Sequence, residues 1–440
     1  MTPLVNRMFD ALDARVGARG AVQEAATKVF PRHWSFLLGE AAVVCFVVLV
    51  LTGVFLSMFY RPSIEPVTYA GEATLFQGRA LPEAFASVVR IVHDVPGGSF
   101  VHRLHTAASH VFVAVILLHF LRVLLTGAFR RPRELNYHLG ILLLLLAIGA
   151  AYTGHKLPFD VTAGNAMRIL YSILLSIPFA GEFVAQWVFG GEFPTGDIIP
   201  RLYAVHIVVL PALIAMGMAA HVGLVVRQTH TQFPRPGVDT TRKVAGEPAW
   251  PWKAASSAVT ALAVVSLLAL SSVFIPWGAV DLHGPYIVAQ VTNASQPDWF
   301  LFWVEGAVRL YPGVEPSLLG TTLTMMFVPG VVLPTVLGAL LFAYPWIEGR
   351  VVGPPREGDH HELQRPTDIP FRVGFVAAMS ALLGVLFVTA SHDVIARLLG
   401  MPLETLTWGL RVAVLALPPV VGVAAARYAR HARDVRKERW

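Results

Sequence analysis

Histidine spacing carries the clearest chemical signal in this 440-residue sequence. His105 and His119 bound the apolar stretch HTAASHVFVAVILLH, and His206 and His221 bound HIVVLPALIAMGMAAH. The two intervals are fourteen and fifteen residues. Because an α-helix turns by about 100° and rises about 1.5 Å per residue, the second imidazole of each stretch returns to within about 60° of the first, roughly 20 Å along the axis. Each stretch therefore predicts an apolar helix with imidazoles at two levels of one face.

Two such helices that run in the same direction place His105 opposite His206 and His119 opposite His221. Paired imidazoles suit the axial positions of an iron macrocycle, which brings four equatorial ligands of its own, whereas zinc requires more protein ligands than two. Ionisable side chains inside a membrane are costly and mark functional sites. We therefore predict two stacked haems, an outer one at His105/His206 and an inner one at His119/His221. The alternative is four unrelated polar residues satisfied by neighbouring helices.

Glycine spacing in two further apolar stretches repeats the histidine interval. Gly39 and Gly53 lie fourteen residues apart, and so do Gly140 and Gly154. A residue without a side chain lets a flat macrocycle approach the helix backbone. Glycine also serves tight packing between membrane helices, so one pair alone would be weak. Two pairs at the same interval predict glycine faces against the two haems.

The elements that position these residues are membrane helices. The chain is 55% hydrophobic and 14% charged, with a mean hydropathy of +0.60. A helix of about 20 apolar residues crosses a bilayer, and it satisfies its own backbone hydrogen bonds there. We predict an all-α polytopic membrane protein, in which an N-terminal four-helix di-haem bundle precedes four further helices. The eight predicted spans are residues 36–59, 104–127, 138–157, 201–226, 253–275, 320–346, 372–392 and 405–427.

The distribution of basic residues predicts the orientation. Of the 34 Lys and Arg residues, 23 lie in the N-terminal segment, in alternate connections between spans and in the C-terminal tail. The positive-inside rule places this side, and with it both termini, in the cytoplasm. The net charge of +6 reflects this orientation, so no nucleic-acid partner is expected.

The chain divides into five predicted segments. The first 30 residues are charged and lack the apolar core of a signal peptide, so they predict a helix on the membrane surface. The segments are a cytoplasmic surface helix (1–35), the four-helix di-haem module (36–230), a cytoplasmic linker (231–252), a C-terminal four-helix module with a long loop (253–427) and a basic cytoplasmic tail (428–440). The single cysteine, Cys45, excludes a disulfide, a Cys-ligated iron–sulfur cluster and a C-x-x-C-H haem attachment within the chain.

Besides the paired histidines and glycines, the chain carries the motifs FPRHWSFLLGE, LTGAFRRPREL, HTQFPRPG, SQPDWF and LQRPTDIP. Together they resemble cytochrome b of the quinol:cytochrome c oxidoreductases over almost the whole chain. The last two motifs, and HDVIA followed by LPP in the eighth span, resemble the actinobacterial branch.

The resemblance implies a redox enzyme subunit in a bacterial plasma membrane. Quinol, in this branch menaquinol, would be oxidised near the outer face. One electron would pass to a Rieske iron–sulfur protein, and the other through the outer low-potential and inner high-potential haem b to a quinone-reducing site, with net outward proton movement. The implied partners are the Rieske protein, a c-type cytochrome subunit, a second copy of this chain and a terminal oxidase. Two alternatives are a di-haem membrane anchor that passes quinol electrons to a separate reductase and a transporter without cofactor.

The resemblance also assigns an outer quinol site in the long loop. The family's Pro-Glu-Trp-Tyr signature reads Pro297-Asp298-Trp299-Phe300 here. A carboxylate beside an apolar pocket can take a proton from quinol, which makes Asp298 the candidate base, with an ordinary loop acid as the alternative. Glu305 is either a second base or the cap of a loop helix.

The remaining candidates lie near the membrane surfaces. Arg227 and His230 follow His221 and are candidates for the inner quinone site, although His230 also fits an ordinary loop residue. Arg122 and Arg201 are either partners of haem propionates or side chains that extend to lipid headgroups. The histidines in loops or at helix ends are expected to be solvated; they include His155, His361 and His392.

Overall fold

The computed structural model describes the chain except for residues 1–12, 16, 291–295, 297, 354–360 and 439–440. Within the described residues, eight helices are long and apolar enough to cross a membrane. This confirms the predicted all-α, eight-span architecture. The spans are Trp34–Ser57, Gly98–Thr126, Glu134–Lys156, Ile198–Arg227, Ala249–Phe274, Val328–Val352, Pro370–Thr389 and Leu403–Glu438.

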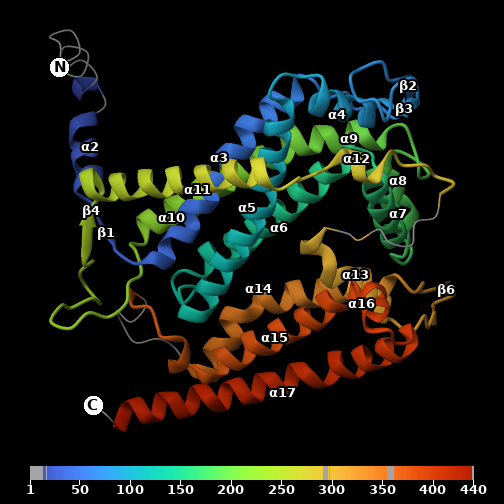
Figure 1. Cartoon of the computed structure of the whole chain (residues 1–440). Helices are drawn as coiled ribbons and strands as arrows, with labels where there is room; N and C mark the ends of the chain where they lie inside the picture. The colour runs from blue at the N-terminus through green and yellow to red at the C-terminus, as the bar shows by residue number, and fades with distance from the viewer. Residues whose placement is uncertain (1–12, 16, 291–295, 297, 354–360, 439–440) are drawn as a thin grey trace.

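The spanning helices form two groups (Figure 1). One group packs together α3 (Leu37–Ser57), α5 (Gly98–Thr126), α6 (Glu134–Lys156), α10 (Leu210–Arg227) and α11 (Ala254–Phe274). The other consists of α14 (Leu333–Val352), α15 (Pro370–Thr389) and α17 (Leu403–Glu438). Helix α15 contacts α5, and α14 contacts α6, so the groups meet along the first group's central helices.

The connections gather at the two ends of the molecule. The N-terminal helix α2 (Ala18–Thr27) and the C-terminal end of α17 lie at the same end in Figure 1, as an even number of crossings requires. Most of the short helices lie at the other end, namely α4 (Glu83–His93), α7 (Val161–Leu175), α8 (Gly181–Phe189), α12 (Val280–His283), α13 (Phe302–Leu310) and α16 (His392–Leu399). In the described part of the chain, three short antiparallel strand pairs lie in the connections: β1 (Val29–Pro31) with β4 (Gly246–Pro248), β2 (Pro66–Thr68) with β3 (Ala80–Pro82), and β5 (Ser317–Leu318) with β6 (Thr321–Thr322).

Two span boundaries differ by more than six residues from those predicted. The sixth span begins at Val328 rather than at residue 320, because the residues before it form the β5–β6 hairpin. Leu319 and Gly320 both have positive φ, 51° and 81°, and a two-residue hairpin turn of type I′ requires positive φ at both central positions. The last span does not end at residue 427, since α17 continues to Glu438.

A buried ion pair within the second helix group lies against the first group near one end of the bundle. Arg372 on α15 is fully buried and donates from Nε to Glu348 Oε2 (2.9 Å) and from Nη2 to Glu348 Oε1 (2.6 Å). Tyr344 donates to the same carboxylate at 2.7 Å. The guanidinium also lies against Gly127, the residue at the C-terminal end of α5, where an added Cβ would be 2.7 Å from Nη2. Arg372 therefore connects α14, α15 and the end of α5.

We expect Arg372→Met to lower the stability of the protein by about 3–5 kcal/mol, because it leaves the Glu348 carboxylate buried without a cation. Thermal denaturation of the detergent-solubilised protein measures the loss. Arg433→Ala is the matched control, since Arg433 pairs with Asp434 in a partly exposed position and such pairs contribute at most about 1 kcal/mol. The double variant Arg372→Met/Glu348→Leu should recover most of the loss. A single variant that melts like the wild type would contradict this account.

Candidate functional site

The four spaced histidines lie on two parallel helical spans of the first group. His105 and His119 are on α5, His206 is in a π-helical turn (Val205–Val209) that follows α9 (Ile198–Ala204), and His221 is on α10. A π turn holds more residues than an α turn. This turn absorbs the extra residue of the fifteen-residue interval, so that both spans present their imidazoles at matching levels.

The structure brings these histidines together in two pairs. The ring centroids of His105 and His206 are 6.3 Å apart with an interplanar angle of 76°. For His119 and His221 the values are 6.4 Å and 75°. A metal–imidazole bond is about 2 Å, and each ring centroid lies about 1 Å beyond the bonded nitrogen, so two axial imidazoles on one metal ion have centroids about 6 Å apart. Both pairs fit that arrangement.

Each of the four spaced glycines lies behind one of these rings. A Cβ added to Gly53 would be 3.3 Å from Cε1 of His105, and one added to Gly39 would be 3.5 Å from Cε1 of His119. On α6, the Cβ of Gly140 would be 3.5 Å from Cε1 of His221, while that of Gly154 would be only 2.5 Å from Cε1 of His206. The four glycines therefore leave room for the imidazoles and for a planar group held between them.

Hydrogen bonds determine which nitrogen of each outer imidazole is free to bind a metal ion. His105 Nδ1 lies 2.8 Å from Thr52 Oγ1, and this hydroxyl donates to the Val48 carbonyl at 2.6 Å. The hydroxyl oxygen therefore accepts from Nδ1–H, which leaves Nε2 as the free ligand atom. His206 Nδ1 lies 3.2 Å from Thr153 Oγ1 and 3.1 Å from the Ala150 carbonyl.

Among the described residues, no three His, Cys, Asp or Glu side chains form a cluster that could hold a metal ion by themselves. Two imidazoles per level match the axial ligand set of haem.

The outer pair opens into a cavity of about 530 Å³. His105, His206, Gly53 and Gly154 line one part of it, and a polar network around Asp298 lines another. One continuous space thus connects the outer imidazole pair with the loop between α11 and α14.

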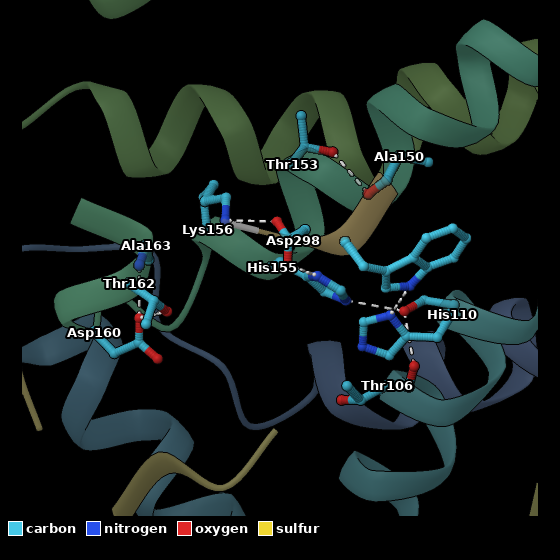
Figure 2. Close-up of polar contacts among 12 residues, drawn as sticks. Thr106, His110, Ala150, Thr153, His155, Lys156, Asp160, Thr162, Ala163 and Asp298 are labelled. Atoms are coloured by element: carbon cyan, nitrogen blue, oxygen red, sulfur yellow. Dashed lines mark hydrogen bonds and ion pairs between the residues drawn. The ribbon is translucent and has the colours of Figure 1, made fainter. Parts of the chain in front are cut away.

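Asp298 is buried between the His155 imidazole and the Lys156 ammonium at the end of α6 (Figure 2). Its Oδ1 lies 2.6 Å from Nδ1 of His155, and its Oδ2 accepts from Nζ of Lys156 at 2.8 Å. The side chains of Asp298, His155 and Lys156 are only 15%, 17% and 3% exposed. Burial raises the pKa of Asp298, but His155 and Lys156 together outweigh it and hold this pKa well below its usual range. Asp298 is therefore an anion.

Further residues complete the network. His155 Nε2 lies 2.9 Å from Ser109 Oγ. The Trp299 indole donates to His110 Nδ1 at 3.0 Å, and Phe300 is buried beside the His155 ring. Pro297 lies outside the described residues. The loop thus presents a carboxylate, an indole and an apolar ring to the same region.

The prediction that His155 is solvated is wrong, because it is largely buried and contacts both Asp298 and Ser109. His392 is also buried, at 7% exposure, and His361 contacts Thr229 and Arg133. A signal for His155 was present in the sequence. The dipeptide His155-Lys156 ends an apolar span, and charged groups at such positions require partners.

Glu305 does not join Asp298. On α13 it accepts from Arg309 Nε at 2.8 Å, and Arg309 also bonds Asp393 at 3.1 Å. Glu305 is not among the residues that line the outer cavity. This ion pair neutralises the Glu305 carboxylate on α13.

Arg122 and Arg201, the two candidate partners of haem propionates, have different surroundings. Arg122 lies over the ring of Phe36, and its Nε donates to Ser35 Oγ at 3.3 Å, while its buried Nη2 has no hydrogen-bond partner among the described residues. That free donor near His119 fits an anionic group. Arg201 is 45% exposed and donates to the Trp187 carbonyl at 2.6 Å.

At the other end of the bundle, His230 packs against Phe30 with ring centroids 4.6 Å apart. Burial, reinforced by Lys28, Lys253 and Arg133, lowers the pKa of His230 to about 4. The imidazole is therefore neutral near pH 7. Arg227 is exposed at the end of α10.

Paired intramembrane imidazoles inside an eight-span helical protein define a class, that of integral membrane haem proteins. Known proteins identify the chain more closely. The family described as Cytochrome b(N-terminal)/b6/petB matches residues 110–285. The "Cytochrome bc1 complex cytochrome b subunit" of Streptomyces coelicolor is 36% identical over 97% of this chain and 77% of its own length. The subunit of the same name in Mycobacterium bovis is 39% identical over 94% of this chain and 75% of its own length.

A solved structure titled "Hyperthermophilic respiratory Complex III" shares the fold, with a TM-score of 0.69 at 19% identity over 95% of this chain and 99% of its own. The chain belongs to the family of cytochrome b subunits of cytochrome bc1 complexes, and its relatives at 34–39% identity are actinobacterial. The family implies haem b and a multi-subunit complex in a membrane.

We expect Gly154→Ala to remove the outer haem, because the new Cβ would lie 2.5 Å from the His206 ring. Gly149→Ala on the same helix is the matched control, since its Cβ would meet only the Leu210 side chain, at 3.9 Å. Pyridine haemochrome analysis should give one b haem per chain for the first variant and two for the second. Two haems with unaltered spectra in Gly154→Ala would contradict the assignment of this glycine.

Proposed function

We propose that this chain oxidises quinol at the outer cavity as the cytochrome b subunit of a respiratory quinol:cytochrome c oxidoreductase. The observation that carries the proposal is the cavity of about 530 Å³ that the outer imidazole pair and the Asp298 network line together. A quinol bound there would be close both to an electron acceptor and to groups that accept a proton. Haem b at His105/His206 and at His119/His221 supplies one-electron redox chemistry on the two sides of the membrane.

The chain's own residues would hold the substrate and take its protons. The Asp298 network is the proton-accepting part of the outer site, and the neighbouring loop residues Pro297, Trp299 and Phe300 are the proposed quinone-binding residues. At the inner site, neutral His230 supplies a hydrogen-bonding group and Arg227 a positive charge for a quinone. Arg122 is the candidate partner of an inner propionate, because its buried Nη2 is free among the described residues. Arg201 would serve the outer haem.

The remaining components must come from other chains. The sequence has one cysteine, so a Rieske iron–sulfur protein and a c-type cytochrome subunit would take the electrons that leave the outer site. We propose menaquinol as the substrate, as the actinobacterial resemblance implies, together with a homodimer, association with a terminal oxidase, and a plasma-membrane location with both termini cytoplasmic.

Two measurements on the purified complex test the proposal. Pyridine haemochrome analysis should give two b haems per chain, whereas a transporter without cofactor would be colourless. Quinol should then drive reduction of cytochrome c. A complex that contains both haems and reduces only a separate reductase would instead be a di-haem anchor.

We expect Asp298→Asn to lower turnover by about 100-fold with haem content unchanged, because a general base contributes about 10²–10⁴-fold to rate and Asn cannot hold the same proton network. Steady-state cytochrome c reduction measures the effect. Glu72→Gln, at an exposed carboxylate in the connection before α4, is the control and should turn over like the wild type. Unaltered turnover of Asp298→Asn would remove this network from proton transfer.

A further inference from the structure

At the edge of the outer cavity, a carboxylate, an imidazole and a hydroxyl lie in line. Asp298 Oδ1 is 2.6 Å from His155 Nδ1, and His155 Nε2 is 2.9 Å from Ser109 Oγ. The three groups come from three elements, the loop before α13, the end of α6 and the middle of α5. His155, Ser109 and Asp298 all line the cavity.

The carboxylate determines the tautomer of the imidazole. Asp298 is ionised and can only accept hydrogen bonds, and its second oxygen is already held by Lys156 at 2.8 Å. Nδ1 of His155 must therefore carry a proton. In the neutral ring this leaves Nε2 as the basic atom, facing Ser109. The same logic lets a buried aspartate orient the histidine of a serine-protease triad.

Ser109 can satisfy His155 in both protonation states. Its hydroxyl has two acceptors within reach, Nε2 of His155 at 2.9 Å and the Thr106 carbonyl at 2.8 Å. When the ring is neutral, the hydroxyl donates to Nε2. When the ring is protonated, Nε2–H donates to the hydroxyl oxygen, and the hydroxyl turns to Thr106. Neither state leaves a buried polar group without a partner, so the proton can be held and released.

We propose that His155 is the catalytic base of the outer site and that Asp298 is its positioning residue. This rests on the quinol oxidation proposed above. A quinol hydroxyl donates its proton to Ser109 Oγ while the Ser109 proton passes to Nε2 of His155. The quinol O–H bond breaks and its electron pair stays on the quinol oxygen, so this proton transfer gives a quinolate anion and an imidazolium. The resulting imidazolium is stabilised by the Asp298 carboxylate.

Lys156 explains why the carboxylate is not the base. A fully buried ammonium that donates to one oxygen and an imidazole that donates to the other make Asp298 a weak proton acceptor. The same two contacts prevent it from turning toward a substrate. The imidazole extends from this anchored carboxylate into the cavity.

His155→Gln in the purified complex tests the inference. Gln keeps a donor toward Asp298 but cannot accept a proton, so we expect kcat to fall about 100-fold or more while KM for menaquinol and haem content stay within about twofold. His138→Gln, the same change at the opposite end of α6, is the matched control and should match the wild type. The double variant His155→Gln/Asp298→Asn should be no slower than the slower single variant, because the two residues act as one unit.

The outcomes separate the two proposals. An active wild type with an active His155→Gln overturns this inference alone and leaves Asp298 as the base. A wild type that does not oxidise quinol overturns the proposed function and this inference with it. If His155→Gln fails to assemble, Ser109→Ala decides: a drop in kcat of about tenfold or more at constant KM and haem content supports the relay, and unaltered kcat overturns it.

Discussion

Each imidazole of the outer pair needs a partner on each nitrogen, and this requirement governs how the first helix group is arranged around it. In the outer pair, the hydroxyls of the threonines that directly precede Gly53 and Gly154 take the Nδ1 side, and the facing ring lies across a gap sized for a metal ion. The glycines behind the rings keep the helices close enough for that gap. Among these four glycines Gly154 leaves the least room, so it limits how α6 can pack against the π turn that carries His206.

Buried charged groups also need partners, and two ion pairs that meet this need connect the helix groups, one at each end. Lys156 at one end of α6 is neutralised by Asp298 from the loop that leads to the second group. At the opposite end, Arg372 and Glu348 of the second group close against the C-terminal end of α5. A buried charge without its partner costs several kcal/mol. Each of these ion pairs therefore holds a connection between the groups in place.

Regular features were predictable from the sequence, and local departures from regularity were not. Long apolar runs predicted all eight spans, and the intervals His105–His119 and His206–His221 predicted which residues share a face. With uniform α-helical geometry, the sequence predicted an angle of about 60° between His206 and His221 around the helix axis. The structure has a π turn that absorbs the extra residue, and nothing in the sequence marks this turn. The hairpin at Leu319-Gly320 was missed because the adjoining residues are apolar enough to extend a span. His155 was missed because its partners, Asp298 and Ser109, are 143 and 46 residues away.

The contacts of Asp298 explain why the loop signature of this chain differs from that of the family. Where the family's Pro-Glu-Trp-Tyr has a glutamate, this chain has the shorter Asp298, and where the family has a tyrosine it has Phe300 without a hydroxyl. A shorter carboxylate clamped by Lys156 and His155 has neither the reach nor the freedom to meet a substrate itself. The His155 ring adds several ångströms of reach toward the cavity, and Ser109 adds the hydroxyl that Phe300 lacks. Proton acceptance would thus have moved from the loop onto α6 and α5, the two helices that also carry Gly154 and His105 of the outer pair.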